Sequence, residues 1–269
     1  MTTPFLRFRR KLSSRQAVNP SNHHSAMPSL AAIFAHPDDE TFAVGGTLAK
    51  LAMRGERWDL FCATDGDAGK SSGIPVASRA ELGALRRNEL LLAARQLGAH
   101  DVECAGHPDG ALGAVDVDQL VGEIVRFLRA RCPDVVITFG PEGAPTGHRD
   151  HKAISRAATA AYFLSGVRTS YPDAGAPHAP QRLYYLTFPP PAPGAELQLE
   201  GLPATARIDV RAQLDAKRHA FDLHVTQKQH EARFIELAML DEEWYALASG
   251  VAQPRAVVED LFEGLGTRD

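Results

Sequence analysis

The hydrophobic residues of this chain fall into short continuous runs that alternate with longer stretches in which they recur every three or four positions. The continuous runs predict strands at residues 30–34, 58–64, 101–104, 133–139 and 182–188. The periodic stretches predict helices at residues 48–53, 78–97, 148–164 and 213–234, and from residue 116 or 118 to 128. Residues 246–262 are a weaker closing region. This alternation is typical of an α/β fold with a Rossmann-like, mostly parallel sheet flanked by helices.

Local signals mark the ends of the helix predicted at residues 78–97. Ser78 is suited to cap its N-terminus, with Glu81 as the partner of a capping box, and Gly98 is suited to end it. Further along, residues 165–205 are rich in proline and glycine outside their one predicted strand. We expect this segment to form loops that shape the substrate site.

A strongly polar turn, His36-Pro37-Asp38-Asp39-Glu40, directly follows the first predicted strand. Open α/β sheets bind ligands at the C-terminal ends of their strands, which is where this turn would lie. A histidine and two carboxylates can hold a divalent cation and leave one carboxylate free as a base. The alternative is a turn in which Asp38 or Asp39 caps the next helix. We favour the functional interpretation, because a cap requires only one of these residues.

A second polar motif, His148-Arg149-Asp150-His151, follows the strand predicted at residues 133–139. His148 and His151 are three residues apart at the start of a helix, so their side chains point to the same side. Two strand ends of one parallel sheet can bring His36, Asp39 and His151 around one ion. Two histidines, one carboxylate and a water form a recognised catalytic zinc set. The alternative is an exposed helix N-terminus decorated with polar residues.

Composition and charge narrow the class of protein. The chain has 269 residues, 44% hydrophobic and 23% charged, which fits a single globular domain over residues 30–269. Its net charge is −4, from 29 basic and 33 acidic residues. Residues 1–29 contain five of the basic residues and no acid, which leaves 24 basic and 33 acidic residues, or −9, for the rest. A body this acidic disfavours nucleic acid or an anionic membrane as the substrate.

The basic segment at residues 1–29 is predicted to be a disordered extension. Two alternatives stay open: a transit peptide, which shares this composition, and upstream sequence placed before a true start at Met27. No apolar run approaches the roughly 20 residues that span a bilayer. Cys62, Cys104 and Cys132 are odd in number and lack the spacing of metal ligands, so they indicate reduced core thiols in a cytoplasmic protein.

The motifs in combination resemble those of the LmbE-like, or PIG-L-type, zinc N-deacetylases, which remove acetyl from N-acetylglucosamine-type groups on small conjugates. The resemblance covers about residues 30–250 and rests mainly on residues 36–40, 64–67 and 147–151. Thr226 stands where the family commonly has serine, and Asp67 where it often has glutamate. Weaker matches are Arg86, Glu89, Asp109, Gly110, Lys217, Ala220, His224, Thr226 and Gln227.

The resemblance implies a role for each residue of the two motifs. Zinc would be bound by His36, Asp39 and His151, and Asp38 would be the general base. His148 would stabilise the oxyanion or protonate the leaving amine. Asp150 would orient His148, and we expect this neighbouring carboxylate to raise the pKa of the imidazole. Candidate contacts to the sugar hydroxyls are Asp67, Arg86 and Asp109; His224 is a candidate for the rim of the site, or else a packed histidine.

The function implied is zinc-dependent N-deacetylation of a small N-acetylglucosaminide, such as a precursor of a low-molecular-weight thiol. Two alternatives within the fold are a zinc amidase acting on a thiol conjugate and a non-catalytic sugar-binding module. Gly45-Gly46 lacks the spacing of a dinucleotide fingerprint, which disfavours a nucleotide-binding protein. The pattern leaves homo-oligomerisation open.

Overall fold

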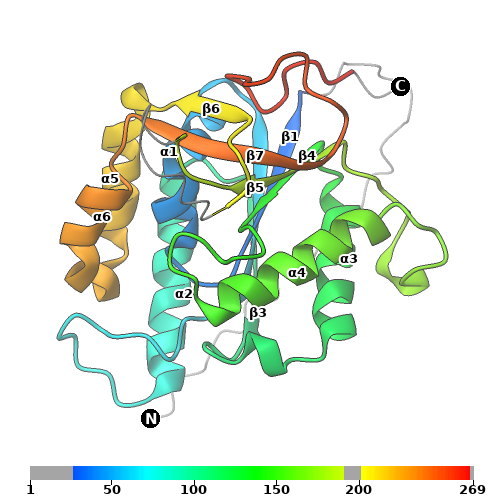
Figure 1. Ribbon diagram of the computed structural model, residues 1–269. Helices are drawn as coiled ribbons and strands as arrows, with labels where there is room; N and C mark the ends of the chain where they lie inside the picture. The colour runs from blue at the N-terminus through cyan, green and yellow to red at the C-terminus, as the bar shows by residue number, and fades with distance from the viewer. Residues whose placement is uncertain (1–26, 191–200, 267–269) are drawn as a thin grey trace, which may run out of the picture.

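Seven strands form one mixed sheet in the computed structural model, which describes residues 27–190 and 201–266 (Figure 1). Their order across the sheet is β3-β2-β1-β4-β5-β7-β6. The first five strands are parallel, β7 runs antiparallel to β5, and β6 runs antiparallel to β7. The predicted mostly parallel α/β fold is therefore confirmed. The strands are β1 (Ser29–Phe34), β2 (Arg57–Thr64), β3 (Asp101–His107), β4 (Val135–Thr138), β5 (Arg182–Leu186), β6 (Ala206–Asp209) and β7 (Glu242–Gly250).

Helices cover both faces of the sheet. Helices α1 (Asp39–Met53), α2 (Arg79–Gln96) and α5 (Leu214–Leu223) pack together on one face, and α3 (Val117–Arg131) and α4 (Arg149–Leu164) pack together on the other (Figure 1). A short helix α6 (Glu231–Leu237) lies beside α5. With helices on both sides, β1 and β4 are buried along their whole length, which explains their unbroken apolar sequences.

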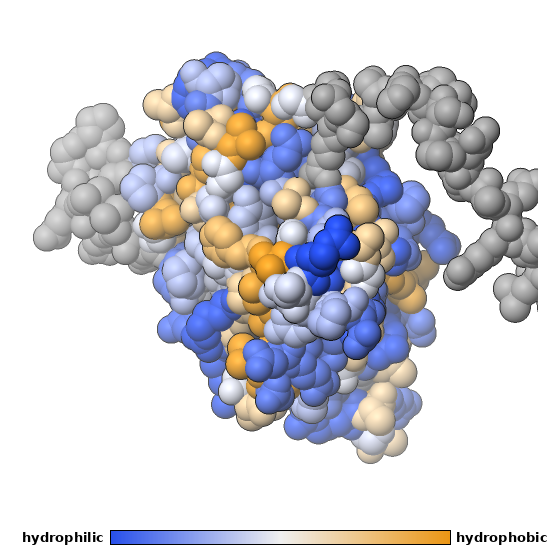
Figure 2. Space-filling view, turned by 90° about the vertical axis from the view of Figure 1, so that its right-hand side faces the viewer, coloured by the Kyte–Doolittle hydropathy of each residue, from blue (hydrophilic) through white to orange (hydrophobic). Residues whose placement is uncertain are grey.

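The outer surface over α3 and α4 carries hydrophobic residues in separate groups among hydrophilic ones (Figure 2). Within the described residues, no helix is both long enough and apolar enough to cross a membrane. The three cysteines are free thiols. Cys62 is buried and Cys104 partly buried, but Cys132 is exposed, so the prediction of a core position is wrong for Cys132. The predicted cytoplasmic location remains a prediction. Most of the segment for which a disordered extension was predicted, residues 1–26, lies outside the described residues.

Several predicted boundaries are correct. Ser78 caps α2 by accepting the amide N–H of Glu81 at 3.1 Å, although the Glu81 carboxylate binds the amide of Ala77 and not that of Ser78. Gly98 follows α2 with a φ of +84°, a conformation that glycine adopts without steric cost. Helix α1 begins at Asp39, well before the predicted residue 48. The pair Gly45-Gly46 lies within these first turns, and because glycine is a poor helix former the sequence there does not indicate a helix.

The C-terminal third differs most from the prediction. The single helix expected at residues 213–234 is broken into α5, a 3₁₀ segment η4 (Val225–His230) and α6. Tertiary hydrogen bonds to His224 and Thr226 fix this break, and they prevail over the helical pattern. Strand β6 was not predicted, and β7 begins before the weak region expected at 246–262. Strand β3 extends past the predicted residue 104 to His107, whose Nε2 lies 2.6 Å from Oε2 of Glu123.

Gly46 permits α1 to approach the chain after β6 closely. A Cβ atom at this position would lie 2.6 Å from Cβ of the buried Val210. We therefore expect Gly46→Val to lower the free energy of unfolding by about 1–3 kcal/mol through overpacking, measured by urea denaturation. Gly113→Val is the control, because a Cβ there meets nothing within 4 Å. Equal effects of the two substitutions would show that the close approach does not limit packing.

Candidate active site

The two polar motifs follow adjacent strands at the point where the chain changes direction across the sheet. From β1 the chain moves outward to β2 and β3, and it then returns to form β4 on the other side of β1. Such a switch point leaves a crevice beyond the C-terminal ends of the two central strands, because their connections run in opposite directions. The turn after β1 carries His36, Asp38 and Asp39, and the loop after β4 leads to His148 and His151.

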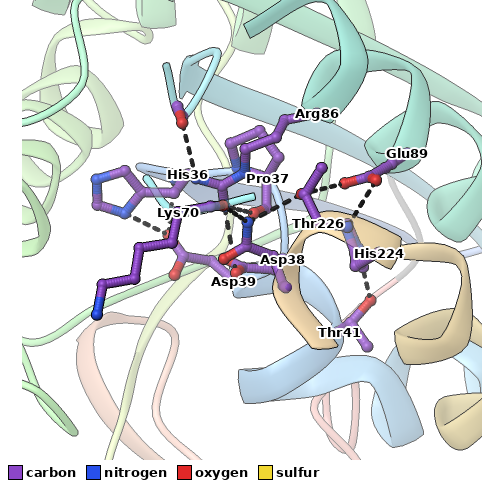
Figure 3. Close-up of polar contacts among 12 residues, drawn as sticks. His36, Pro37, Asp38, Asp39, Thr41, Lys70, Arg86, Glu89, His224 and Thr226 are labelled. Atoms are coloured by element: carbon purple, nitrogen blue, oxygen red, sulfur yellow. Dashed lines mark hydrogen bonds and ion pairs between the residues drawn. The ribbon is translucent and has the colours of Figure 1, made fainter. Parts of the chain in front are cut away.

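Asp39 is held rigidly at the start of α1. Its Oδ2 accepts the backbone N–H of Ala35 at 3.2 Å and of His36 at 2.8 Å. Its Oδ1 lies 3.3 Å from Nε2 of His151, and Oδ2 lies 3.5 Å from Nδ1 of His36. Burial favours the neutral acid, but His151 and His36 hold the pKa of Asp39 well below its ordinary value. The carboxylate is therefore charged and lies between two imidazoles, of which Figure 3 shows that of His36.

His151 is oriented by contacts on two sides. Its ring stacks on Phe139, with centroids 3.9 Å apart, and Nδ1 lies 3.2 Å from the hydroxyl of Thr146. Donation from Nδ1 to Thr146 would leave the lone pair of Nε2 directed toward Asp39 and the crevice. A second partner of this kind fixes the tautomer and direction of a metal-binding histidine. Thr146 and Phe139 were not singled out from the sequence.

The donor set fits a cation. Nε2 of the buried His36 lies 3.1 Å from Asp109 and 3.4 Å from Asp150, yet it forms no hydrogen bond of acceptable geometry with any described residue. Burial disfavours charge on His36, but Asp109, Asp150 and Asp39 raise its pKa well above the ordinary value. Ring nitrogens of His36, His148 and His151 lie within 4.8 Å of one another. Negative charge and imidazole nitrogens thus converge on one point, as a divalent ion requires.

His148 has a definite tautomer when neutral. Its Nδ1 accepts the backbone N–H of Asp150 at 3.2 Å, so the proton must be on Nε2. Burial and the neighbouring His36 and His151 lower the pKa of His148, and Asp150 does not compensate. Asp150 does raise the pKa of His148, as expected, but burial and the two neighbouring imidazoles outweigh its effect, so the expected net increase is not found. The Asp150 carboxylate faces His36 and accepts the amides of Gly110 and Leu112 instead.

Asp38 does not share the environment of Asp39. Its backbone has a φ of +113°, which turns its side chain away from that of its neighbour and toward Arg86, 3.3 Å away. Burial raises the pKa of the Asp38 carboxyl to about 6, although Arg86 opposes the change. A carboxyl with a pKa in this range is suited to accept a proton near neutral pH.

The three candidate sugar contacts have different positions. Asp109 lines the cavity, where one oxygen faces His36 and the other accepts the amide of Ala68. Arg86 also lines it, but its N–H groups are directed to the carbonyls of Pro37 and Gly66 and to Asp38 (Figure 3). Asp67 does not line the cavity; it pairs with Arg79 and accepts the amide of Asp109. Contacts of these residues with a sugar remain predictions.

The cavity over these residues has a volume of about 380 Å³. Its outer wall comes from α1 and from the segment after α5, where the sequence offered only weak family matches and His224 as a candidate for the rim. No described residue between 165 and 205 lines it, so the expected substrate-shaping role of that segment is not confirmed. His224 is fully buried and not at the rim. The wall residues absent from the prediction are Phe42, His230, Arg233 and Leu237, whereas Gln227, which also lines the wall, was a weak match to the family.

Comparison with known proteins agrees with this architecture. Residues 31–162 match the family model described as GlcNAc-PI de-N-acetylase, or PIG-L. A curated relative from Rhodococcus jostii RHA1, named 1D-myo-inositol 2-acetamido-2-deoxy-alpha-D-glucopyranoside deacetylase, is 32% identical over 88% of this chain and 98% of its own length. A relative of the same name from Streptomyces avermitilis is 28% identical, with 88% and 97% covered. The chain belongs to the PIG-L, or LmbE-like, family of deacetylases.

Solved structures share the fold. N,N'-diacetylchitobiose deacetylase from Pyrococcus horikoshii superposes with a TM-score of 0.68 at 19% identity, covering 85% of this chain and 86% of its own. The 4-carboxy-2-hydroxymuconate hydratase GalB from Pseudomonas putida KT2440 gives 0.69 at 19% identity, with 85% and 99% covered. Proteins titled as a deacetylase and as a hydratase thus have the same fold, so the argument for function must rest on the site.

We expect Arg86 to support the first motif. Arg86→Leu should lower the free energy of unfolding by about 1–3 kcal/mol, because it leaves buried carbonyls and Asp38 without their donor. The adjacent Arg87 is the control: it pairs with Asp65 at 2.6 Å but its side chain is 44% exposed. Arg87→Leu should cost at most about 1 kcal/mol. Urea denaturation measures both values, and equal losses would contradict a supporting role for Arg86.

Proposed function

We propose that this protein is a zinc-dependent hydrolase that removes the N-acetyl group from a small molecule containing N-acetylglucosamine. The observation that carries the proposal is the convergence of His36, Asp39 and His151 in one cavity, with Asp38 and His148 beside them. Membership of the PIG-L family supports the deacetylase chemistry. A binding module would not need the buried carboxyl of Asp38 beside a cation site.

Zinc would be held by His36, Asp39 and His151, with the two imidazoles on either side of the carboxylate. When bound, it would lower the pKa of a coordinated water to about 7 and polarise the acetamide carbonyl. His148 also has a ring nitrogen within 4.8 Å of ring nitrogens of His36 and His151, so it is a fourth candidate ligand. We assign His148 to the substrate and not to the metal. Its Nδ1 accepts a backbone N–H, so its Nε2 carries the proton and neither nitrogen is free to bind zinc.

Proton transfer is assigned to Asp38 and His148. Asp38, held by Arg86 and turned away from Asp39, would accept the proton of the attacking water. His148, neutral with its proton on Nε2, would donate a hydrogen bond to the developing oxyanion. The leaving amine needs a proton for the C–N bond to break, and it would take the proton that Asp38 accepted from the water. Water adds hydroxyl to the acetyl carbon, so acetate and the free amine are the products.

The curated relatives suggest the class of substrate. Their names specify a glucosaminide of myo-inositol, a small conjugate rich in hydroxyl groups. A cavity of about 380 Å³ with Asp109, Gln227 and Arg233 on its walls is suited to a disaccharide-sized molecule with several hydroxyls. We therefore propose a 2-acetamido-2-deoxyglucoside with a polar aglycone, processed in the cytoplasm.

The test is acetate and amine release from a panel of N-acetylglucosaminides that includes the myo-inositol and malate conjugates, with an N-acyl thiol conjugate as a further arm. We expect turnover of at least one glucosaminide, loss of turnover after chelation, and recovery with Zn²⁺. Turnover of the thiol conjugate alone would favour the amidase. Sugar binding without turnover in the zinc-loaded protein would favour the non-catalytic module.

Substitution should separate metal ligands from groups that act on the substrate. Asp38→Ala and His148→Ala should abolish measurable turnover and keep zinc, because neither residue is among the three ligands. His151→Ala should lose zinc, because one of two imidazoles is removed. Metal content after dialysis, measured by atomic emission, is the readout. If His148→Ala were the zinc-free protein and His151→Ala retained the metal, the roles of the two histidines would be exchanged.

A further inference from the structure

The backbone of Asp38 adopts a conformation that a residue with a side chain rarely takes. Its φ of +113° lies in the left-handed region, although the residue is not glycine. Such a conformation persists only where the surrounding contacts fix it. One of these contacts is direct: the N–H of Asp38 donates to Oε2 of Glu40 at 3.0 Å. Glu40 therefore holds the backbone from which the Asp38 carboxyl projects.

Glu40 is itself fixed by a histidine that is distant in the sequence. Nε2 of His224 lies 2.8 Å from Oε1 of Glu40, and the hydroxyl of Thr41 donates to the same oxygen at 2.6 Å. The side chains of Glu40 and His224 are 1% and 0% exposed. Since a carboxylate only accepts, Nε2 of His224 must carry the proton. Figure 3 shows His224, on the segment that follows α5, directed at Thr41 of α1.

The turn that carries His224 is held to a third element. Thr226 donates its amide and its hydroxyl to Glu89 of α2, at 2.9 and 2.6 Å (Figure 3). A continuous series of buried polar contacts therefore connects α2 and the end of α5 to the amide of Asp38. The candidate zinc ligands do not depend on this series. Asp39 is held by the amides of Ala35 and His36, and His151 by Phe139 and Thr146.

We propose that Glu40 and His224 are positioning residues for Asp38: His224 fixes the Glu40 carboxylate, which holds the Asp38 backbone in the orientation that directs its carboxyl toward the attacking water. The role rests on the proposed deacetylase function. It differs from a general contribution to folding because the series ends on the base and not on the metal ligands. Misorientation of the base should slow the chemical step, leaving substrate and zinc binding intact.

A second buried ion pair in the same part of the molecule supplies a matched control. Nζ of Lys217 lies 2.6 Å from Oε1 of Glu243, and the two side chains are 1% and 5% exposed. Lys217 is on α5, the helix that ends just before His224. Glu243 accepts the amides of Gly46 and Thr47 in α1. This pair joins the same helices but does not contact the residues assigned to catalysis or zinc.

The experiment compares the full-length wild type with His224→Leu, His224→Gln, Glu40→Gln and Lys217→Met, each loaded with zinc. Readouts are kcat, KM, zinc content and Tm. We expect His224→Leu and Glu40→Gln to lower kcat by about 10–100-fold, the range for residues that orient a site indirectly. KM and zinc content should stay unchanged. His224→Gln keeps an N–H donor toward Glu40 and should recover most of the activity, whereas Lys217→Met should lower Tm and keep kcat.

The outcomes separate this inference from the function on which it rests. A wild type that releases no acetate from any glucosaminide would overturn both. An active wild type whose kcat falls as much in Lys217→Met as in His224→Leu would overturn the positioning role alone, as would loss of zinc from His224→Leu. If His224→Leu does not fold, the comparison of Glu40→Gln with Lys217→Met decides, and equal kcat values in these two would refute the proposal.

Discussion

The site depends on keeping several carboxylates close together in a buried crevice without neutralising them. Asp38, Asp39 and Glu40 are consecutive, and Asp109 and Asp150 approach the same imidazole from other loops. Burial and charge repulsion disfavour such a cluster. Each of the five has a polar partner that offsets part of this cost: a guanidinium, backbone amides or a histidine, together with the positive end of α1 for the three that begin this helix.

Because their polar partners differ, the consecutive residues Asp38, Asp39 and Glu40 are suited to different roles. Asp39 is committed to two amides and two imidazoles, which suits a metal ligand, whereas the left-handed backbone of Asp38 directs its carboxyl to Arg86. Glu40 is turned into the core, where it meets His224. Buried ion pairs of this kind contribute little net stability, because desolvation offsets the attraction. Their value in this protein lies in fixing the geometry of one turn.

The cavity joins two parts of the chain with different origins. Its floor belongs to the loops after β1 and β4, which any sheet with this strand order would bring together. Most of its outer wall is formed by residues 227–238, which are distant in the sequence from the residues of the floor. The residues proposed to act in catalysis lie in the floor, and the wall would set the shape offered to a substrate. Proteins with the same fold can therefore differ in activity, as the names of the deacetylase and the hydratase with this fold indicate.

Much of the central fold could be predicted from the sequence, because strands buried on both faces leave unbroken apolar runs and helices leave periodic ones. The capping of α2 by Ser78 and the placement of both motifs after strands were predicted for the same local reasons. The C-terminal region was not. The helix predicted at 213–234 breaks where Glu40 and Glu89 bind His224 and Thr226, and a pattern of hydrophobic residues contains no information about such distant partners.

The sequence by itself determined which side chains have the chemistry of a metal hydrolase, because His36, Asp38, Asp39, His148 and His151 are recognisable by type and spacing. Only the tertiary structure decided how they face one another. It directed Asp150 to His36, gave His148 its tautomer through a backbone amide, and committed Arg86 to the first motif. Those assignments depend on distances between residues far apart in the chain, which folding sets and local sequence does not encode.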